Sequence, residues 1–458
     1  MKSKKLLSLL LIFTLIISLF AACSGGGSND AGKDEPAPAT EGEDTGTEAE
    51  TPPADKPAAS GEKVEISFWY GWGGTEGEAM KKLIQKFNDS QDRIVVIGTE
   101  EGDYSKQTTA IAAGNPPDVA SNFGHATVPN GVTGQNTPLD AYMEKSGLDA
   151  SAFVPGAIKQ QQYDGVTYAV PLNMHISMLL YNKKILAEAG YDRPPETIQE
   201  MEEYFDKLSQ IEPTGEIKRL AFYPNLDIYS YAYVFGGGFY NESTGEITPQ
   251  DPGLIEAMKW NAKMWKKAGG SEKINPFTAS LGGWLTAEDP FFVGKYAMTS
   301  GGEWVPTFQK KFAPDLDMGI APMPYDAKHP EKKGAGTVNT STLYIPKGAK
   351  HPDEAWEFIN WFMQPENVAE WNAAIGNLPP VLAALDVPVF DNVPGFKEFL
   401  EESKNPNLVT FPASPYMADY MNEIGVAYNE VLLGNMTAEQ AAKQIADKMV
   451  PILEKHKK

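Results

Sequence analysis

Cysteine is almost absent from this chain of 458 residues, because Cys23 is the only one. A lone cysteine excludes an internal disulfide, and with it a disulfide-stapled scaffold or a dithiol redox centre. The five histidines are scattered without metal-ligand spacing, and the sequence has no P-loop, dinucleotide fingerprint, H-E-x-x-H motif or EF-hand loop. A Ser/His/Asp triad or a carboxylate pair assembles from distant positions, so the sequence neither nominates nor excludes one.

Positive charge is also in short supply. Lysine and arginine together number 39 against 61 aspartates and glutamates, which gives a formal net charge of −22. Nucleic acid and anionic lipid both require a basic face on the protein that binds them. The acidity of the chain therefore argues against either as a direct partner.

Long hydrophobic runs are missing except for one near the N-terminus. Three lysines within residues 1–5 precede 17 uncharged and mostly apolar residues, from Leu6 to Ala22. A membrane-spanning helix needs about 20 apolar residues, so residues 1–22 are predicted to be a secretory signal peptide. No later segment is apolar for long enough to span a bilayer, which predicts an exported protein.

Cys23 follows that run in the stretch LFAACSGGG, which resembles the bacterial lipobox. The resemblance implies that Cys23 is the acylated N-terminus of a lipoprotein, bearing diacylglycerol and palmitate. Phe20 departs from the pattern, because the usual leucine is displaced by one position to Leu19. The alternative is an ordinary signal peptide followed by an incidental cysteine.

Residues 24–60 contain no aromatic side chain and no Leu, Ile, Val or Met. Such a segment has nothing to bury and is expected to be a disordered acidic tether that follows the lipidated Cys23. As a flexible coil, its 37 residues would have a root-mean-square reach of about 35 Å. A long tether suits a cell with a thick wall, which favours a Gram-positive host and a protein held at the outer face of the cell membrane.

Residues 61–458 form too long a body for one ordinary core and are expected to divide into two lobes. The stretch VEISFW places Val64, Ile66 and Phe68 on one face of a strand, and apolar residues at helical spacing follow it. The apolar run RIVVI, a helix that ends at Gly114 and a strand after NPPD continue the alternation. Strands alternating with helices indicate an α/β body with largely parallel sheets.

Capping patterns and one apolar stripe locate later helices. Thr197 with Glu200, and Thr437 with Gln440, have the spacing of a capping box at a helix N-terminus. In PDEAWEFINWFM the apolar residues recur at helical spacing, so Trp356 is expected in the core and not in contact with a ligand.

Four stretches in order resemble one family, the extracellular solute-binding proteins of ABC importers, in the carbohydrate-binding group that includes maltose-binding protein. One departure is Ile198, where that family commonly has tryptophan. The four stretches are IAAGNPPDVA at 111–120, YDGVTYAVPLNMHISMLLYNKKILAEAGYDRPPET at 163–197, FFVGKYAMTSGGEW at 291–304 and STLYIPKGAKHPDEAWEFINWFM at 341–363.

The resemblance implies two discontinuous α/β lobes that are joined by a hinge and close on a ligand. The N-terminal lobe would comprise residues 61–173 and 317–375, and the C-terminal lobe residues 174–316 and 376–458. It also implies a monomeric receptor that is not an enzyme and needs no cofactor or metal. The receptor would capture a small carbohydrate in the cleft and deliver it to the transmembrane subunits of a permease.

The stretch ISFWYGWGGTEGEAM at 66–80 would then bring a glycine-rich loop to the rim of the cleft. Glycine lets backbone approach a ligand closely, so Gly73 is a candidate contact. Trp72 would offer an aromatic face to the C–H face of a sugar ring. The alternatives are that Trp72 only caps the sheet, and that Trp69 points inward.

Motif alignment places other family cleft positions on polar and aromatic residues. The tryptophan in SGGEW often stacks on the ligand in this family. Each histidine also has a purely structural interpretation, and tyrosines as dense as these also occur in strand cores. The candidates are Asn122, Phe123, His125, Asn173, His175, Tyr229, Tyr231, Glu303, Trp304, Tyr416 and Tyr420.

Arginine supplies an inference that does not depend on the resemblance. Arg93, Arg193 and Arg219 are the only arginines, and none falls in an expected cleft loop. Arginine is the side chain suited to bidentate capture of carboxylate or phosphate. A neutral mono- or oligosaccharide therefore fits better than an anion, although lysine could still supply a point charge.

Two other classes of protein stay open at this stage. A lipid-anchored glycoside hydrolase would need two carboxyl groups about 5 to 9.5 Å apart, and the acids to inspect are Asp118, Glu303 and Asp419. A surface carbohydrate-binding or sensory module would share the cleft but have no role in transport.

Overall fold

The computed structural model describes residues 63–241 and 244–456, which all lie in the compact unit Gly61–Lys458. The predicted signal peptide, the lipidation site Cys23 and the acidic tether lie outside the described residues. Within residues 63–241 and 244–456, every helix is too short or too polar to cross a membrane.

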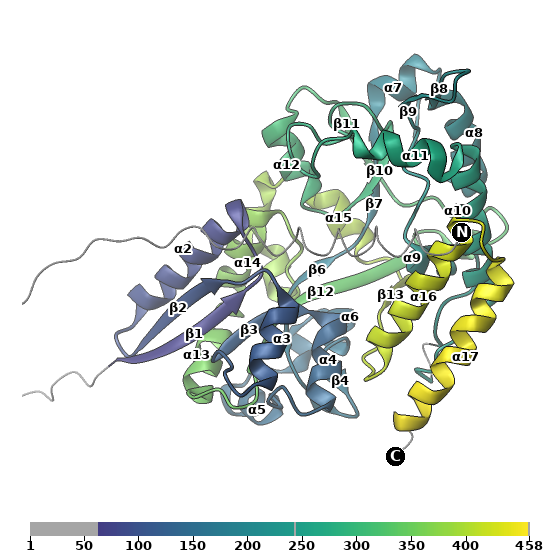
Figure 1. Ribbon diagram of the computed structural model, residues 1–458. Helices are drawn as coiled ribbons and strands as arrows, with labels where there is room; N and C mark the ends of the chain where they lie inside the picture. The colour runs from purple at the N-terminus through teal and green to yellow at the C-terminus, as the bar shows by residue number, and fades with distance from the viewer. Residues whose placement is uncertain (1–62, 242–243, 457–458) are drawn as a thin grey trace, which may run out of the picture. The chain divides into compact units, whose positions relative to one another are not determined.

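The larger sheet has six strands in the order β13-β12-β3-β1-β2, with β6 paired to β12 (Figure 1). β1 runs parallel to β2 and β3, and β12 runs parallel to β13 but antiparallel to β3 and β6. The strands are β1 Val64–Tyr70, β2 Ile94–Glu100, β3 Val119–Phe123, β6 Val170–His175, β12 Gly336–Tyr344 and β13 Leu408–Thr410.

The smaller sheet is antiparallel throughout, in the order β10-β7-β11. Its strands are β7 Met178–Asn182, β10 Met298–Gly301 and β11 Met318–Ala321. Two residues, Ile176 and Ser177, join β6 of the larger sheet to β7. The prediction of largely parallel sheets is therefore wrong for this sheet and only partly right for the other, because strand alternation in sequence does not reveal strands that return from distant parts of the chain.

Helices cover these sheets, and two short hairpins complete the fold. α2 packs on β2, α13 on β1 and α14 on α2, while α9, α10, α16 and α17 pack together (Figure 1). The hairpins are β4 Gln162–Tyr163 with β5 Val166–Thr167, and β8 Gln210–Ile211 with β9 Ile217–Arg219. The α-helices are α2 Gly74–Ser90, α3 Tyr104–Ala112, α4 Gly124–Val132, α5 Asp140–Ser146, α6 Pro155–Lys159, α7 Lys183–Glu188, α8 Ile198–Leu208, α9 Ile228–Val234, α10 Pro252–Lys267, α11 Gly270–Ala279, α12 Val305–Phe312, α13 Pro352–Phe362, α14 Pro365–Ile375, α15 Phe396–Glu402, α16 Met417–Leu432 and α17 Ala438–His456.

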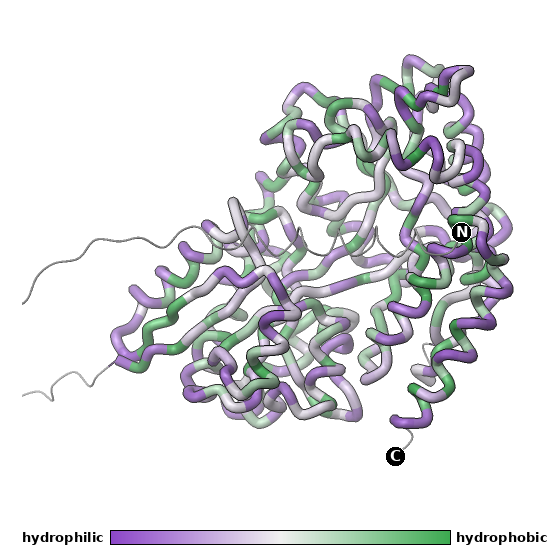
Figure 2. Tube along the Cα trace, viewed as in Figure 1, coloured by the Kyte–Doolittle hydropathy of each residue, from purple (hydrophilic) through white to green (hydrophobic). Residues whose placement is uncertain are grey.

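The predicted caps and stripe are present. Thr197 Oγ1 accepts from the N–H of Glu200 at the start of α8, and Thr437 and Gln440 make both reciprocal bonds of a capping box before α17. Trp356 is buried on α13. Figure 2 shows the resulting alternation of hydrophilic and hydrophobic residues along the helices.

Two large hydrophobic clusters form the cores, and β7 of the smaller sheet contributes side chains to both. The first contains Phe68 of β1 and Trp371 of α14, and the second contains Tyr231 of α9 and Tyr420 of α16. Phe390 packs in the first cluster although it lies beyond residue 376. The lobe boundaries inferred from the sequence stay a prediction.

Candidate functional site

An open cavity of about 630 Å³ lies at the junction of β6 with β7, against β12. This volume is in the usual range for a site that holds a small organic ligand. Its walls come from both hydrophobic clusters and from the loops that connect their strands to helices. The lining residues are Gly71, Trp72, Glu76, Tyr104, Phe123, His175, Ile176, Ser177, Asp227, Leu285, Trp304, Phe308, Thr337, Asn339, Ser341, Asn377 and Phe411.

Four of the residues nominated from sequence line this cavity: Trp72, Phe123, His175 and Trp304. Phe123 ends β3 and is partly exposed, and Tyr104 of α3 packs edge-on against it with ring centroids 5.3 Å apart. Aromatic surface is therefore presented from several separate elements.

Trp304 is half-buried and packs edge-on against His175, with ring centroids 5.3 Å apart and planes at 85°. Gly302 is required beneath it, because a Cβ there would lie 2.2 Å from an atom of the Trp304 ring. Gly302 thus lets the indole fold back over the turn before α12, where Trp304 lines the cavity.

A hydrogen-bonded chain fixes His175 at the end of β6. Its Nδ1 lies 2.8 Å from Oε1 of Glu303, which is fully buried, and its Nε2 lies 3.2 Å from Oγ of Ser341 on β12. A carboxylate only accepts, so Nδ1 donates to Glu303, and in the neutral ring Nε2 accepts from Ser341. Glu303 therefore lies behind the wall and holds His175 in place.

Trp72 contributes to the wall in a different way. It is only 9% exposed and packs edge-on against Trp371 of α14, with centroids 5.2 Å apart. Gly71 lines the cavity, and a Cβ at that position would meet the hydroxyl of Tyr104. Gly73 packs against Glu100 and does not line the cavity. The loop was expected to serve the ligand, but much of its glycine content serves local packing.

Three further nominated residues lie directly behind the wall. Asn122 is 3% exposed and bonds to the adjacent N–H of Phe123, and Asn173 is fully buried and accepts from the N–H of Ser341. His125 stacks parallel to Phe123 with ring centroids 5.8 Å apart, and burial lowers the pKa of its imidazole. These side chains support residues that face the cavity.

None of the four nominated tyrosines lines this cavity, although Tyr231 lines a small pocket beside it. Tyr420 is fully buried and donates to the carbonyl of Phe239, and Tyr229 donates to the carbonyl of Met421. Tyr231 is 1% exposed, and Tyr416 packs beside the ring of His456. Dense tyrosine here marks the core around α9 and α16, which was the alternative interpretation from sequence.

Sequence reasoning missed a polar face of β12. Thr337, Asn339 and Ser341 all line the cavity at a spacing of two, so they point to the same side of the strand. Residues 339–342 are polar at every position, so the sequence GTVNTSTLY does not distinguish this face before the fold is known. Asp227 and Asn377 gave no periodic signal either, because each is an isolated polar residue.

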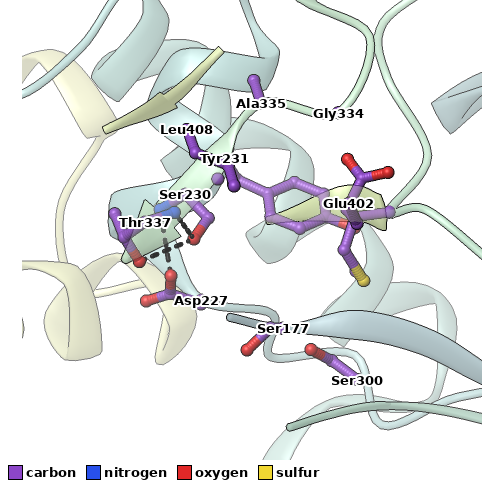
Figure 3. Close-up of a pocket in the computed structure, with 12 residues that line it drawn as sticks. Ser177, Asp227, Ser230, Tyr231, Ser300, Gly334, Ala335, Thr337, Glu402 and Leu408 are labelled. Atoms are coloured by element: carbon purple, nitrogen blue, oxygen red, sulfur yellow. Dashed lines mark hydrogen bonds between the residues drawn. The ribbon is translucent and has the colours of Figure 1, made fainter. Parts of the chain in front are cut away.

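A small side pocket of about 20 Å³ opens off the cavity and shares Ser177, Asp227 and Thr337 with it (Figure 3). This volume holds about one water molecule. Asp227 accepts from the N–H of Ser230 at 3.0 Å, and the hydroxyls of Ser230 and Thr337 are 3.0 Å apart. Glu402 closes the pocket, and burial raises its pKa. The pocket extends the polar part of the site.

The charge of the wall is acidic. Among the described residues that line the cavity, Glu76 and Asp227 are the charged ones and there is no lysine or arginine. Burial raises the pKa of Glu76, and the neighbouring His175 lowers it in part. The site therefore offers acceptors, hydroxyls, amides and aromatic faces, but no fixed positive charge.

The acids considered for a hydrolase do not form a pair at the cavity. Asp118 is buried and accepts from backbone N–H groups at Lys350 and His351, so it fixes a turn. Glu303 binds His175, and Asp419 is exposed on α16. None of the three lines the cavity.

The chain belongs to the bacterial extracellular solute-binding protein family, whose model matches residues 82–398. It is thus an exported binding protein and not an enzyme. Among curated proteins it is similar to the maltotriose-binding protein of Pyrococcus abyssi (strain GE5 / Orsay), with 25% identity over 375 residues covering 80% of this chain and 77% of the relative.

A second similar protein is the sn-glycerol-3-phosphate-binding periplasmic protein UgpB of Escherichia coli (strain K12), 23% identical over 411 residues, or 84% of this chain and 90% of the relative. Among solved structures, the chain resembles CpMnBP1 with mannotriose bound, at a TM-score of 0.75 and 29% identity, covering 84% of this chain and 99% of that one. The prediction of a two-lobed α/β binding-protein fold is confirmed by this match.

Proposed function

We propose that this protein captures a neutral mono- or oligosaccharide in the cavity between its lobes and delivers it to the transmembrane subunits of an ABC permease. The observation that carries the proposal is the make-up of the cavity wall. Aromatic rings from Trp304 and Phe123 stand beside hydrogen-bonding groups, and the described lining residues include no lysine or arginine. A sugar ring has an apolar C–H face and a fringe of hydroxyls, which is the complementary surface.

The names of the relatives offer two ligand classes, oligosaccharides and a phosphorylated polyol. A phosphate carries more than one negative charge and is bound by arginine, lysine or helix N-termini. Glu76 and Asp227 would repel it from this wall. The charge pattern therefore favours the neutral sugar, in agreement with the scarcity of arginine in the sequence.

We also propose the contacts and the motion. Trp304, Phe123 and His175 touch the ligand directly, and Trp72 contributes the edge left free by its packing on Trp371. The lobes, with boundaries near residues 173, 316 and 375, close around the ligand. A ligand shifts an open–closed balance only by its different affinity for the two states, so closure requires contacts to both lobes.

We infer further that Cys23 is acylated and that residues 24–60 tether a monomeric receptor to the outer face of the membrane. The resemblance of LFAACSGGG to a lipobox and the apolar-poor segment after it support this proposal. A Gram-positive host is the setting that such a tether favours. Mass spectrometry of the intact exported chain would detect the diacylglyceryl and acyl groups on Cys23, and Cys23→Ala would release the protein into the medium.

Thermal unfolding of the purified chain against a ligand panel tests the function. The panel holds neutral saccharides, uronates, amino acids and polyol phosphates. A ligand that binds only the native state raises the melting temperature by mass action. We expect a shift with neutral saccharides and no loss of the saccharide with time. A shift with polyol phosphates alone would overturn the proposal, and release of shorter sugars would restore the hydrolase alternative.

A further inference from the structure

Leu285, in the wall of the cavity, has a backbone conformation that leucine seldom adopts. Two described residues other than glycine have positive φ, Asp164 at 50° and Leu285 at 55°. Asp164 precedes Gly165 in the two-residue turn between β4 and β5, where Asp-Gly is favoured and positive φ is required. Leu285 also lies in a turn, over Trp284–Leu285, but that turn has no glycine, asparagine or aspartate at the position of positive φ, where a leucine is disfavoured.

A buried carboxylate holds the segment around Leu285 in this conformation. Asp289 is 1% exposed, and its two oxygens accept from the N–H groups of Leu285 at 2.8 Å and Phe291 at 2.9 Å. Phe291 and Phe292 then anchor the segment in the hydrophobic cluster around the larger sheet. Strained residues persist where the surroundings over-determine them, and they gather at ligand sites. Here the strain places the Leu285 side chain in the cavity wall.

The residue before it, Trp284, is 52% exposed, which is more than any other described tryptophan. Consecutive Cα atoms lie about 3.8 Å apart, so the indole is attached next to a residue of the wall of an open cavity. The indole thus carries a large apolar face that is not used in either core. Because Asp289 and the two phenylalanines hold the segment, the ring is presented from a rigid support, and ordering it on a ligand costs little entropy.

We propose that Trp284 is an outer subsite, a stacking platform for a sugar unit that projects from the mouth of the cavity. This inference rests on the proposed function and deepens it, because it makes the protein selective for oligosaccharides over the monosaccharide. Trp304 and His175 hold the inner units, Leu285 forms the rim, and Trp284 covers the outer unit. An aromatic face next to a sugar needs no charge, in keeping with a neutral ligand.

Isothermal titration of the purified full-length chain in detergent, with manno- and malto-oligosaccharides of one to six units, tests the subsite. Trp284→Ala is expected to lower the affinity for the longer members about tenfold and to leave the shortest member that binds unchanged. Trp284→Phe should keep most of the affinity, because a ring remains. Ile97→Ala is the control, since Ile97 is 50% exposed on β2 and does not line the cavity.

The outcomes separate this inference from the proposed function. If the unaltered chain binds neither series and no neutral saccharide of the thermal-shift panel raises its melting temperature, the proposed function fails. If it binds them, and Trp284→Ala changes no affinity or lowers all of them equally, the outer subsite alone is overturned. Tryptophan fluorescence provides a second measurement, because a long saccharide should shift the emission of the unaltered chain to shorter wavelength more than that of Trp284→Phe. Equal shifts would count against the subsite.

Discussion

The segments Gly71–Gly73 and Gly302–Trp304 look alike in sequence, since each follows a strand, contains glycine and carries one tryptophan. Their indoles have different surroundings. Trp72 meets Trp371 of α14 and is buried, while Trp304 packs at the margin of the same cluster, beside His175, and stays half-buried. A glycine-aromatic pattern therefore predicts where a ring is placed in the fold. The side chains packed against the ring decide whether it is buried in the core or stays accessible at the cavity.

The largest effect is expected where the ring belongs to the core. Trp72→Ala removes an indole packed on Trp371 and leaves a cavity, so the free energy of unfolding should fall by about 3 kcal/mol. Urea unfolding followed by circular dichroism measures the loss. A variant as stable as the unaltered chain would show that Trp72 is not a core residue, and the difference between Trp72 and Trp304 would disappear.

The second effect should fall on binding. Trp304→Ala removes the half-buried face and is expected to weaken saccharide binding by about tenfold or more, while the melting temperature changes little. Titration with the saccharide that gives the largest thermal shift provides the affinity. If the affinity were unchanged, Trp304 would not be a ligand-binding residue.

A glycine substitution sharpens the same contrast without removing a ring. The Cβ of Gly302→Ala would overlap the Trp304 indole and force it off its present position, so saccharide affinity should fall a few-fold with little loss of stability. Calorimetric titration beside Trp304→Ala checks this. Additive losses in the double variant would argue that Gly302 does not act through Trp304.

The smallest effect is expected at Glu76, an acidic residue that lines the same cavity as Trp72 and Trp304. Burial raises the pKa of Glu76 in the folded chain, so its ionised form costs stability once the pH exceeds that raised pKa, and the cost disappears below the ordinary carboxyl range. Glu76→Gln should therefore melt slightly higher at pH 7, with no difference near pH 3, and should bind saccharide more weakly. Melting curves across pH test this, and a lower melting temperature at pH 7 would contradict it.

Much of the fold could be predicted from the sequence, for identifiable reasons. The strand at Val64, the caps at Thr197 and Thr437 and the stripe around Trp356 depend on neighbours within a few residues, where periodicity and capping operate. The strand pairings could not be predicted, because β12 joins β3, β6 and β13 from distant parts of the chain.

The site shows the same division. Motif position located Trp304 and His175, whereas burial of Tyr231 and Tyr420 depends on the helices packed around them. No local pattern pointed to Asp227 or Leu285, which reach the cavity only through the folded loops that carry them. Local signals thus identified the ends of elements, and long-range packing decided which side chains line the cavity.

Strand β12 has an uneven set of neighbours along its length. At Ser341 it is paired on both edges, with Phe123 and with Asn173, while Gly336–Val338 is paired with β13. Amide protons exchange with solvent only when their hydrogen bonds open, so the two halves of this strand should exchange at different rates. The amide protons of the doubly paired half should exchange slowly whether or not a ligand is bound. Those near Thr337, which lines the cavity, should exchange more slowly when a sugar is bound than in the free protein.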